Sequence, residues 1–294
     1  MPAFTRRQLF LLIALTIVWG VNWPIMKLGV QHFPPLSFRA ISMWIGLGVV
    51  FAAVRAQGLS LRIARAHWGK LAQLTLFNMV IWHCLVIVAM PMVSSGRAAI
   101  LGYTMPIFSA VIGSWVYRDA LAPRAWLGVG AAFSGVMLLL WHEFGALGSR
   151  PTGAILILIA AACWAIGTQL LRRAQLPVPV LSLSLWMMLF TALVMTLCAT
   201  IFERAQWHWP DMVAINVILF NGVLVIGFAQ IVWFVLARSL PPVASTLSVM
   251  FIPVLGVFSG AWWLGEVLHW QDWTAVALMV LAIASVLWPS KTST

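Results

Sequence analysis

The same pattern of residues occurs twice along the chain. Proline, glycine and tryptophan residues of the first half recur in the second half at a constant spacing of 147 residues, and Asp119 is matched by Glu266. The identical pairs are Pro106 with Pro253, Gly113 with Gly260, Trp115 with Trp262, Trp126 with Trp273 and Trp141 with Trp288. Because these matches need no gap, the sequence predicts two halves with the same fold.

The composition places both halves in a membrane. Hydrophobic residues make up 63% of the 294 residues and charged residues 8%, whereas soluble domains carry about 25% charged residues. A bilayer core of about 30 Å needs about 20 apolar residues per helix. Short loops separate ten such segments, so we predict an all-α integral membrane protein with ten transmembrane helices at 8–27, 36–54, 71–91, 98–117, 125–141, 153–171, 180–201, 212–236, 243–263 and 271–288.

The two halves are expected to have opposite orientations in the membrane. Their beginnings match at a spacing of 145 residues, with Trp19 opposite Trp164 and Lys27 opposite Arg172. Each half then holds five helices, and an odd number inverts the second copy. We predict a first repeat at 1–147 and a second, inverted repeat at 148–294, packed around a central cavity. Such inverted repeats are typical of transporters, because two similar halves can rock around one shared site.

The distribution of charge sets the orientation. Twelve Lys and Arg residues fall in loops on the side of the N-terminus and five on the opposite side. Cytoplasmic loops carry the excess of Lys and Arg, so both termini are predicted to be cytoplasmic. A basic cytoplasmic face suits anionic lipid headgroups, and it explains the net charge of +11 without a nucleic acid partner. Arg6 and Arg7 are interpreted as orientation anchors of the first helix rather than as part of an export signal.

The start of the first helix carries a family resemblance. The segment Trp19-Gly20-Val21-Asn22-Trp23-Pro24-Ile25-Met26-Lys27, set in a duplicated five-helix unit, resembles the EamA-type members of the drug/metabolite transporter superfamily over essentially the whole chain. Within that superfamily the chain is similar to bacterial inner-membrane exporters of amino acids, above all to the aromatic amino acid exporter branch. The resemblance implies a multi-pass protein of the bacterial cytoplasmic membrane that exports amino acids, aromatic or otherwise neutral, and related metabolites by alternating access.

Two prolines are candidates for hinges. Pro106 and Pro253 lie inside the fourth and ninth predicted spans, where proline removes a helical hydrogen bond and favours a kink. A pair of small residues four positions apart follows each proline, which lets helix backbones approach closely. We predict that these symmetry-related helices gate transport, although a static kink would give the same pattern; the residues involved are Pro106, Pro253, Gly113 and Gly260.

Polar and aromatic residues near mid-span are the candidates for substrate contact. Polar side chains at membrane depth are rare, and together with indoles they could line a mostly apolar site of the kind that binds small molecules. Asn and Gln also join helices to one another, so each has a structural alternative. The predicted substrate-binding residues are Trp82, His83, Tyr103 and Trp164 first, then Asn78, Asn22, Trp19 and Gln230.

No acidic residue is expected inside the membrane, because all six lie in predicted loops or at span ends. A cationic drug would find no counter-charge, which favours a neutral or zwitterionic substrate. Facilitated movement down a gradient is therefore the first hypothesis for energetics. Proton coupling through His83, the one histidine in mid-span, is the alternative.

Other classes of protein fit the sequence less well. An intramembrane enzyme would need a nucleophile with its base, paired acids or metal ligands, and neither these patterns nor a phosphate-binding loop occur. No metal or cofactor is expected. The runner-up is an exporter of another small metabolite, a sugar phosphate or a drug, possibly coupled to protons. Ten helices can enclose a cavity in one subunit, so a functional monomer is expected.

Overall fold

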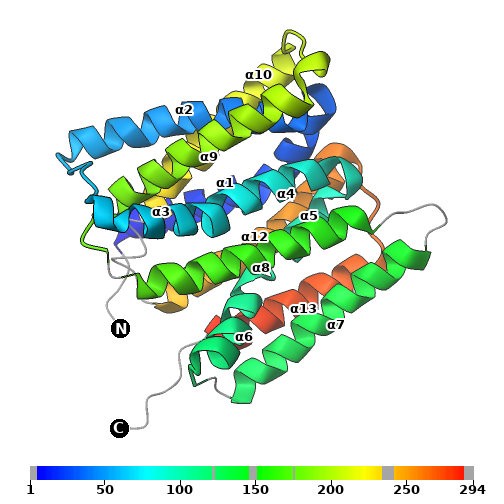
Figure 1. Cartoon of the computed structure of the whole chain (residues 1–294). Coiled ribbons are helices and arrows are strands. Elements are labelled where there is room, and N and C mark those ends of the chain that lie inside the picture. Colours follow the sequence, from blue (N-terminus) through cyan, green and yellow to red (C-terminus); the bar gives the residue numbers. More distant parts are fainter. Residues whose placement is uncertain (1–4, 121–122, 146–150, 175, 234–241, 288–294) are drawn as a thin grey trace.

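The computed structural model describes residues 5–120, 123–145, 151–174, 176–233 and 242–287, and every long element in these ranges is helical (Figure 1). The first repeat contains α1 (Arg6–His32), α2 (Pro35–Ala56), α3 (Trp68–Thr75), the π-helix η2 (Leu76–Val80), α4 (Ile81–Ala89), α5 (Ser95–Gly102), α6 (Met105–Tyr117) and α7 (Pro123–Gly145). The second contains α8 (Thr152–Arg173), α9 (Val180–Phe202), α10 (Met212–Leu219), the π-helix η5 (Phe220–Ala229), α12 (Pro242–Leu264) and α13 (Trp270–Leu287). The proposed boundary at 147/148 lies outside the described residues.

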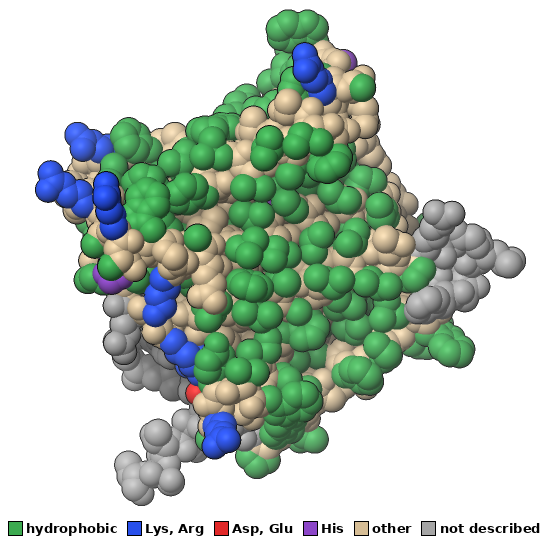
Figure 2. Space-filling model, in the orientation of Figure 1, with side chains coloured by type: hydrophobic (Ala, Val, Ile, Leu, Met, Phe, Trp, Pro, Cys, Tyr) green, Lys and Arg blue, Asp and Glu red, His purple; other side chains and the backbone are tan. Residues whose placement is uncertain are grey.

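The prediction of ten membrane helices is confirmed. Eight described segments are long and apolar enough to cross a bilayer, and the apolar stretches Phe251–Leu264 and Trp270–Ser285 provide two more. Figure 2 shows a broad apolar surface, with most of the visible Lys and Arg side chains along the edge near the chain termini. We call the end at which α1 begins the inner end of the protein, and the end at which it finishes the outer end.

The main helix pairs join one repeat to the other. The second helices of the repeats, α2 and α9, pack together on one side, and the fifth helices, α7 and α13, pack together on the opposite side (Figure 1). Between these pairs, α1 packs on α12 and α8 packs on α6. First helices thus pack on fourth helices in both directions, as an inverted duplication requires.

The two prolines have different local structures. Pro106 stands at the start of α6, after a break at Tyr103 and Thr104 that separates α5 from α6. Pro253, in contrast, lies inside the continuous helix α12. The Thr104 hydroxyl donates to the Leu101 carbonyl at 2.6 Å, a local bond that helps to end α5. The expected symmetric kink is therefore a full break in one repeat only.

The ends of the fourth helices are alike in both repeats. Arg118 after α6 and Gly265 after α12 are separated by the repeat spacing, and their φ angles are 58° and 65°. The next residues, Asp119 and Glu266, donate their backbone N–H groups to the carbonyls of Gly113 and Gly260 at 3.0 and 3.4 Å. This is the left-handed cap that commonly ends a helix, and it places one carboxylate beside each fourth helix.

Candidate functional site

Four aromatic side chains from both repeats meet in the middle of the helices. The rings of Trp82 on α4 and Trp164 on α8 are edge to face, with centroids 5.3 Å apart. Trp23 and Tyr103 form a second edge-to-face pair at 6.5 Å. Gly102 joins the pairs, because a Cβ atom there would lie 2.7 Å from the Trp23 ring and 3.3 Å from the Trp82 ring. The structure thus brings together Trp82, Tyr103 and Trp164 and adds Trp23.

Trp19 lies between two apolar groups. It packs against Trp233, at 5.7 Å between ring centroids, in an apolar group near the inner end, and it also packs against the core group that contains Trp23, Trp82 and Tyr103. Gln230 directly follows η5 and precedes Trp233 by three residues.

The buried amides of Asn78 and Asn22 have unsatisfied polar atoms. Asn78 lies in η2, where it packs so closely on α8 that a Cβ atom at Gly167 would be 2.6 Å from its side chain. Asn78 Nδ2 and Asn22 Oδ1 are buried, and neither has a hydrogen-bond partner among the described residues. Buried polar atoms without partners are unusual in folded proteins, so each amide keeps one hydrogen-bonding atom unused.

The same tripeptide occurs at the start of both π-helices. Leu76-Phe77-Asn78 opens η2, and Leu219-Phe220-Asn221 spans the last residue of α10 and the first two residues of η5. Short π-helical segments occur frequently at functional sites. The tripeptide is a signal that sequence reasoning missed, and it could have pointed to Asn221 as the counterpart of Asn78.

Arg39 is a buried cation beside this site. Its side chain is 3% exposed, and its guanidinium donates to Asn221 Oδ1 at 3.5 Å and contacts Met26 Sδ. His83 on α4 lies within electrostatic range of the same guanidinium. Arg39 lies near the outer end of α2, and its side chain turns into the protein.

The outer ends of the two repeats are held together by Glu266. Its carboxylate accepts hydrogen bonds from the Ser95 N–H at 2.6 Å, the Ser95 hydroxyl at 2.9 Å and the Gly96 N–H at 3.2 Å. An anion at a helix N-terminus is stabilised by the free N–H groups there, so Glu266 caps α5. Lys27 adds its charge to this site, while its ammonium donates to the carbonyls of Met90, Pro91 and Val93.

The symmetry-related carboxylate makes a different contact at the inner end. Asp119 Oδ2 lies 2.7 Å from Arg173 Nη2 on α8. Gln169, one turn earlier on α8, donates to the Ser109 hydroxyl on α6 at 3.0 Å. The predicted gating glycines stand directly beside these contacts, because a Cβ atom at Gly113 would lie 3.0 Å from the Asp119 carboxylate and one at Gly260 would lie 2.6 Å from that of Glu266.

Comparison with known proteins shows how far this architecture is shared. Residues 6–141 and 151–288 each match the EamA-like transporter family. The chain belongs to that family. Its members are transporters rather than enzymes, and the paired match agrees with the two repeats. A solved crystal structure has the same fold, with a TM-score of 0.70, 20% sequence identity and 96% of each chain covered.

Individual relatives of this EamA-like transporter differ in how much is known of them. The chain is 28% identical to the uncharacterized transporter YoaV of Bacillus subtilis, with 92% of each protein covered. It is 25% identical to a probable amino-acid metabolite efflux pump of Salmonella typhimurium, over 95% of this chain and 93% of the relative. The aromatic amino acid exporter YddG of Ancylobacter novellus is 26% identical over 68% of this chain and 69% of its own length.

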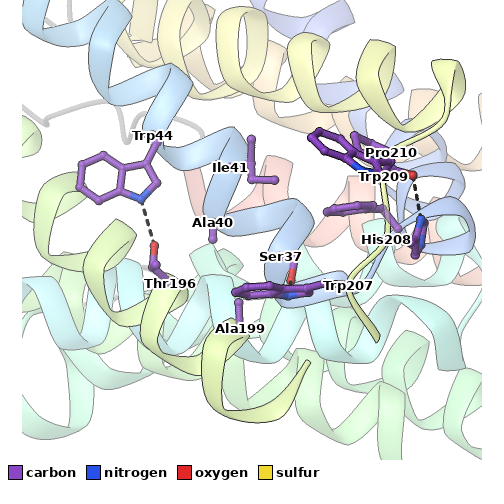
Figure 3. Close-up of a pocket in the computed structure, with 11 residues that line it drawn as sticks. Ser37, Ala40, Ile41, Trp44, Thr196, Ala199, Trp207, His208, Trp209 and Pro210 are labelled. Atoms are coloured by element: carbon purple, nitrogen blue, oxygen red, sulfur yellow. Dashed lines mark hydrogen bonds between the residues drawn. The ribbon is translucent and has the colours of Figure 1, made fainter. Parts of the chain in front are cut away.

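The transporter also has a pocket away from the predicted site. It has a volume of about 530 Å³ and opens at the outer end between α2, α9 and the loop at 207–210 (Figure 3). Trp207 donates to the Ser37 hydroxyl at 2.8 Å and Trp44 donates to the Thr196 hydroxyl at 2.9 Å. None of the predicted substrate-binding residues lines this pocket.

The carboxylates that the structure describes lie at helix ends. Glu203 accepts hydrogen bonds from the backbone N–H groups of Leu36 and Ser37 at 2.8 and 2.7 Å. Asp211 Oδ2 lies 2.7 Å from His32 Nδ1. Asp272 Oδ1 lies 2.8 Å from Arg97 Nε. The side chain of Glu143 is outside the described residues. Among the described side chains, no group of His, Cys, Asp and Glu is arranged to hold a metal ion.

Proposed function

We propose that this chain exports neutral amino acids, preferably aromatic ones, across the bacterial cytoplasmic membrane by alternating access, as a monomer with both termini in the cytoplasm. The observation that carries the proposal is the Trp82–Trp164 pair, which takes one indole from each repeat. With Trp23 and Tyr103 it offers aromatic faces to an apolar side chain, as small-molecule sites commonly do. The names of two relatives, an amino-acid metabolite efflux pump and an aromatic amino acid exporter, support the same substrate class.

In alternating access, the contacts between the repeats at the outer end and at the inner end of the protein would break and form in turn. At the outer end α5 packs closely on α12, where a Cβ atom at Gly96 would lie 3.1 Å from Val257 Cα. This contact, together with the Glu266 bonds, corresponds to a carrier closed toward the outside. Opening to the outside would separate α5 from α12 and Glu266, and the break at Tyr103 and Thr104 gives α5 a place to pivot. Proline at 106 removes the helical bond that would resist this movement.

The site favours movement down the substrate gradient. The described carboxylates all lie at helix ends, so none is placed to carry a proton through the middle of the membrane. His83 is the one mid-span histidine, and proton exchange through it is the alternative. The gradient from cytoplasm to exterior would then supply the free energy of export.

Counterflow in proteoliposomes tests the proposal. Purified protein is reconstituted into vesicles loaded with unlabelled phenylalanine, tryptophan or threonine, and uptake of the labelled amino acid is followed without an ion gradient. We expect exchange that is faster for the aromatic amino acids than for threonine. Folded protein that exchanges no amino acid would contradict the substrate class, and exchange that requires an imposed pH gradient would contradict facilitated movement.

A further inference from the structure

Arg39 is a cation whose hydrogen-bonding capacity is largely unused. Guanidinium has five N–H donors, yet among the described residues its hydrogen-bond partners are one amide oxygen at 3.5 Å and a thioether, and its Nε has no hydrogen-bond partner although it is buried. The Phe38 ring, 5.7 Å from the guanidinium carbon, adds a cation–π contact but accepts no hydrogen bond in the plane of the fork. A thioether sulfur is a weak acceptor. No described carboxylate lies within 4 Å of this guanidinium, whereas Arg97 and Arg173 both have one. Burying an ion without a counter-ion is costly, so this arrangement needs a reason.

The second repeat shows that the fold does not need a cation at this position. The segment Pro34-Pro35-Leu36-Ser37-Phe38-Arg39 corresponds to Pro179-Val180-Leu181-Ser182-Leu183-Ser184 at the repeat spacing of 145. Both segments begin a second helix, α2 and α9, and Ser184 is 5% exposed. The same position in the same fold is thus filled by a small hydroxyl in one copy and a guanidinium in the other. The cation is a feature of one repeat only.

The surroundings of Arg39 suit a small anion attached to an aromatic group. Arg39 contacts Met26, which lies three residues beyond Trp23 on α1. Three helical residues span about 4.5 Å along the axis, so the methionine that Arg39 contacts lies within one helical turn of a member of the aromatic cluster. His83, within electrostatic range of Arg39, follows Trp82 in sequence. The guanidinium fork matches a carboxylate with two parallel hydrogen bonds.

We propose that Arg39 binds the carboxylate of the substrate, which replaces the Met26 thioether as its partner. This inference rests on the proposed function for the side chain held by the aromatic cluster. It names the polar end of the substrate: a single carboxylate, held between α1, α2 and η5. The site provides one cation, because Lys27 already donates to three carbonyls, and one cation suits a carboxylate better than a doubly charged phosphate.

The test compares a carboxylate with its uncharged isostere. Binding of 3-phenylpropionate, 3-phenylpropionamide and phenyl phosphate to the full-length protein is measured calorimetrically at constant pH and salt. Charge-assisted hydrogen bonds favour the carboxylate over the amide by about 10- to 100-fold, and we expect this preference in the wild type. Arg39→Gln should abolish it, Arg39→Lys should retain part of it, and Ser184→Ala, the matched change in the other repeat, should leave it intact.

The outcomes separate this inference from the proposed function. A carboxylate preference that persists in Arg39→Gln, a stronger affinity for phenyl phosphate than for phenylpropionate, or no carboxylate preference in the wild type would overturn the inference, even if amino acid counterflow is robust. An Arg39-dependent preference without amino acid counterflow would support the anion site and refute amino acid export. If Arg39→Gln does not fold, Arg39→Lys decides: because it loses the fork geometry, an unchanged preference would overturn the inference.

Discussion

Ser95 and Glu266 join the two repeats at the outer end of the protein, with the Ser95 N–H and hydroxyl donating to the two carboxylate oxygens at 2.6 and 2.9 Å. Glu266→Gln should loosen the first turn of α5, because a neutral amide replaces a charge-assisted acceptor worth about 1.5–3 kcal/mol per bond. We expect amide hydrogen exchange at Ser95 and Gly96 to accelerate at least about tenfold. Asp119→Asn, the matched change at the inner end, should leave this exchange unchanged; protection that survives Glu266→Gln would disprove the closure.

Gly260 allows this contact to form. A Cβ atom there would lie 2.3 Å from the Ser95 hydroxyl and 2.6 Å from the Glu266 carboxylate, so Gly260→Ala must displace hydrogen-bonded atoms. Overpacking of this kind costs about 1–3 kcal/mol, and we expect a lower melting temperature. Gly48→Ala on α2 is the control, because a Cβ atom there meets nothing within 4 Å. Equal melting temperatures for the two variants would contradict the close packing.

Arg118 carries backbone strain that its counterpart Gly265 avoids. Their φ angles are 58° and 65°, in a region that costs a residue with a side chain about 1–2 kcal/mol. Arg118→Gly should therefore raise the free energy of unfolding by about 1 kcal/mol, and Gly265→Ala should lower it by a similar amount. Denaturant unfolding of both variants checks the pair, and changes of the same sign would refute the equivalence of the two caps.

Trp82 should matter for substrate affinity. Trp82→Leu removes one ring of the pair with Trp164, and aromatic pairs contribute about 0.5–1.5 kcal/mol beyond their buried area. We expect the half-saturation concentration for tryptophan counterflow to rise about tenfold, because the substrate loses one aromatic face. Trp115→Leu, at a site that is 73% exposed, is the control. Unchanged tryptophan counterflow in Trp82→Leu would remove the aromatic cluster from the substrate site.

Acid should weaken one contact at the outer end. The pKa of the Asp211 carboxyl lies below its ordinary value of 3.8. The main cause is the hydrogen bond from the Ala214 N–H, and the hydrogen bond from His32 is the second. A carboxyl with a lowered pKa in the folded state stabilises the fold above the unfolded pKa, and this contribution is lost as the pH falls through the folded pKa. The melting-temperature difference between wild type and Asp211→Ala should shrink as the pH falls below about pH 4. A difference that grows in acid would reverse the assigned sign.

The sequence predicted the architecture well because its signals are local and repeated. Apolar length fixes a membrane span, and the matched prolines, glycines and tryptophans establish the duplication. Side-chain direction could not be predicted in the same way. The position of Arg39 in α2 gives only the depth of its Cα atom in the membrane. A long cationic side chain near a helix end ordinarily turns toward water. Here the side chain turns inward, where it contacts residues of other helices.

The break between α5 and α6 was also beyond prediction. Pro106 and Pro253 have the same sequence context, with small residues at matching positions, yet one stands at the start of a helix and the other lies within one. The difference depends on packing partners: α5 lies against α12, while α6 lies against α8. Local sequence indicates where a helix can break, and tertiary contacts determine whether it does.

The described carboxylate contacts between the repeats are unequally divided between the two ends. At the outer end, four carboxylates of the second repeat contact the first repeat: Glu203, Asp211, Glu266 and Asp272. At the inner end, Asp119 is the one described carboxylate that links the repeats. In a gradient-driven carrier this inequality cannot set the direction of net flux. It makes substrate binding differ between the two sides of the membrane instead. Only a fraction of the molecules is open to the outside, and the apparent dissociation constant of an external ligand is raised by the inverse of that fraction. Such a carrier saturates at lower concentration from the cytoplasm than from outside, and so resists inhibition by the product it has released.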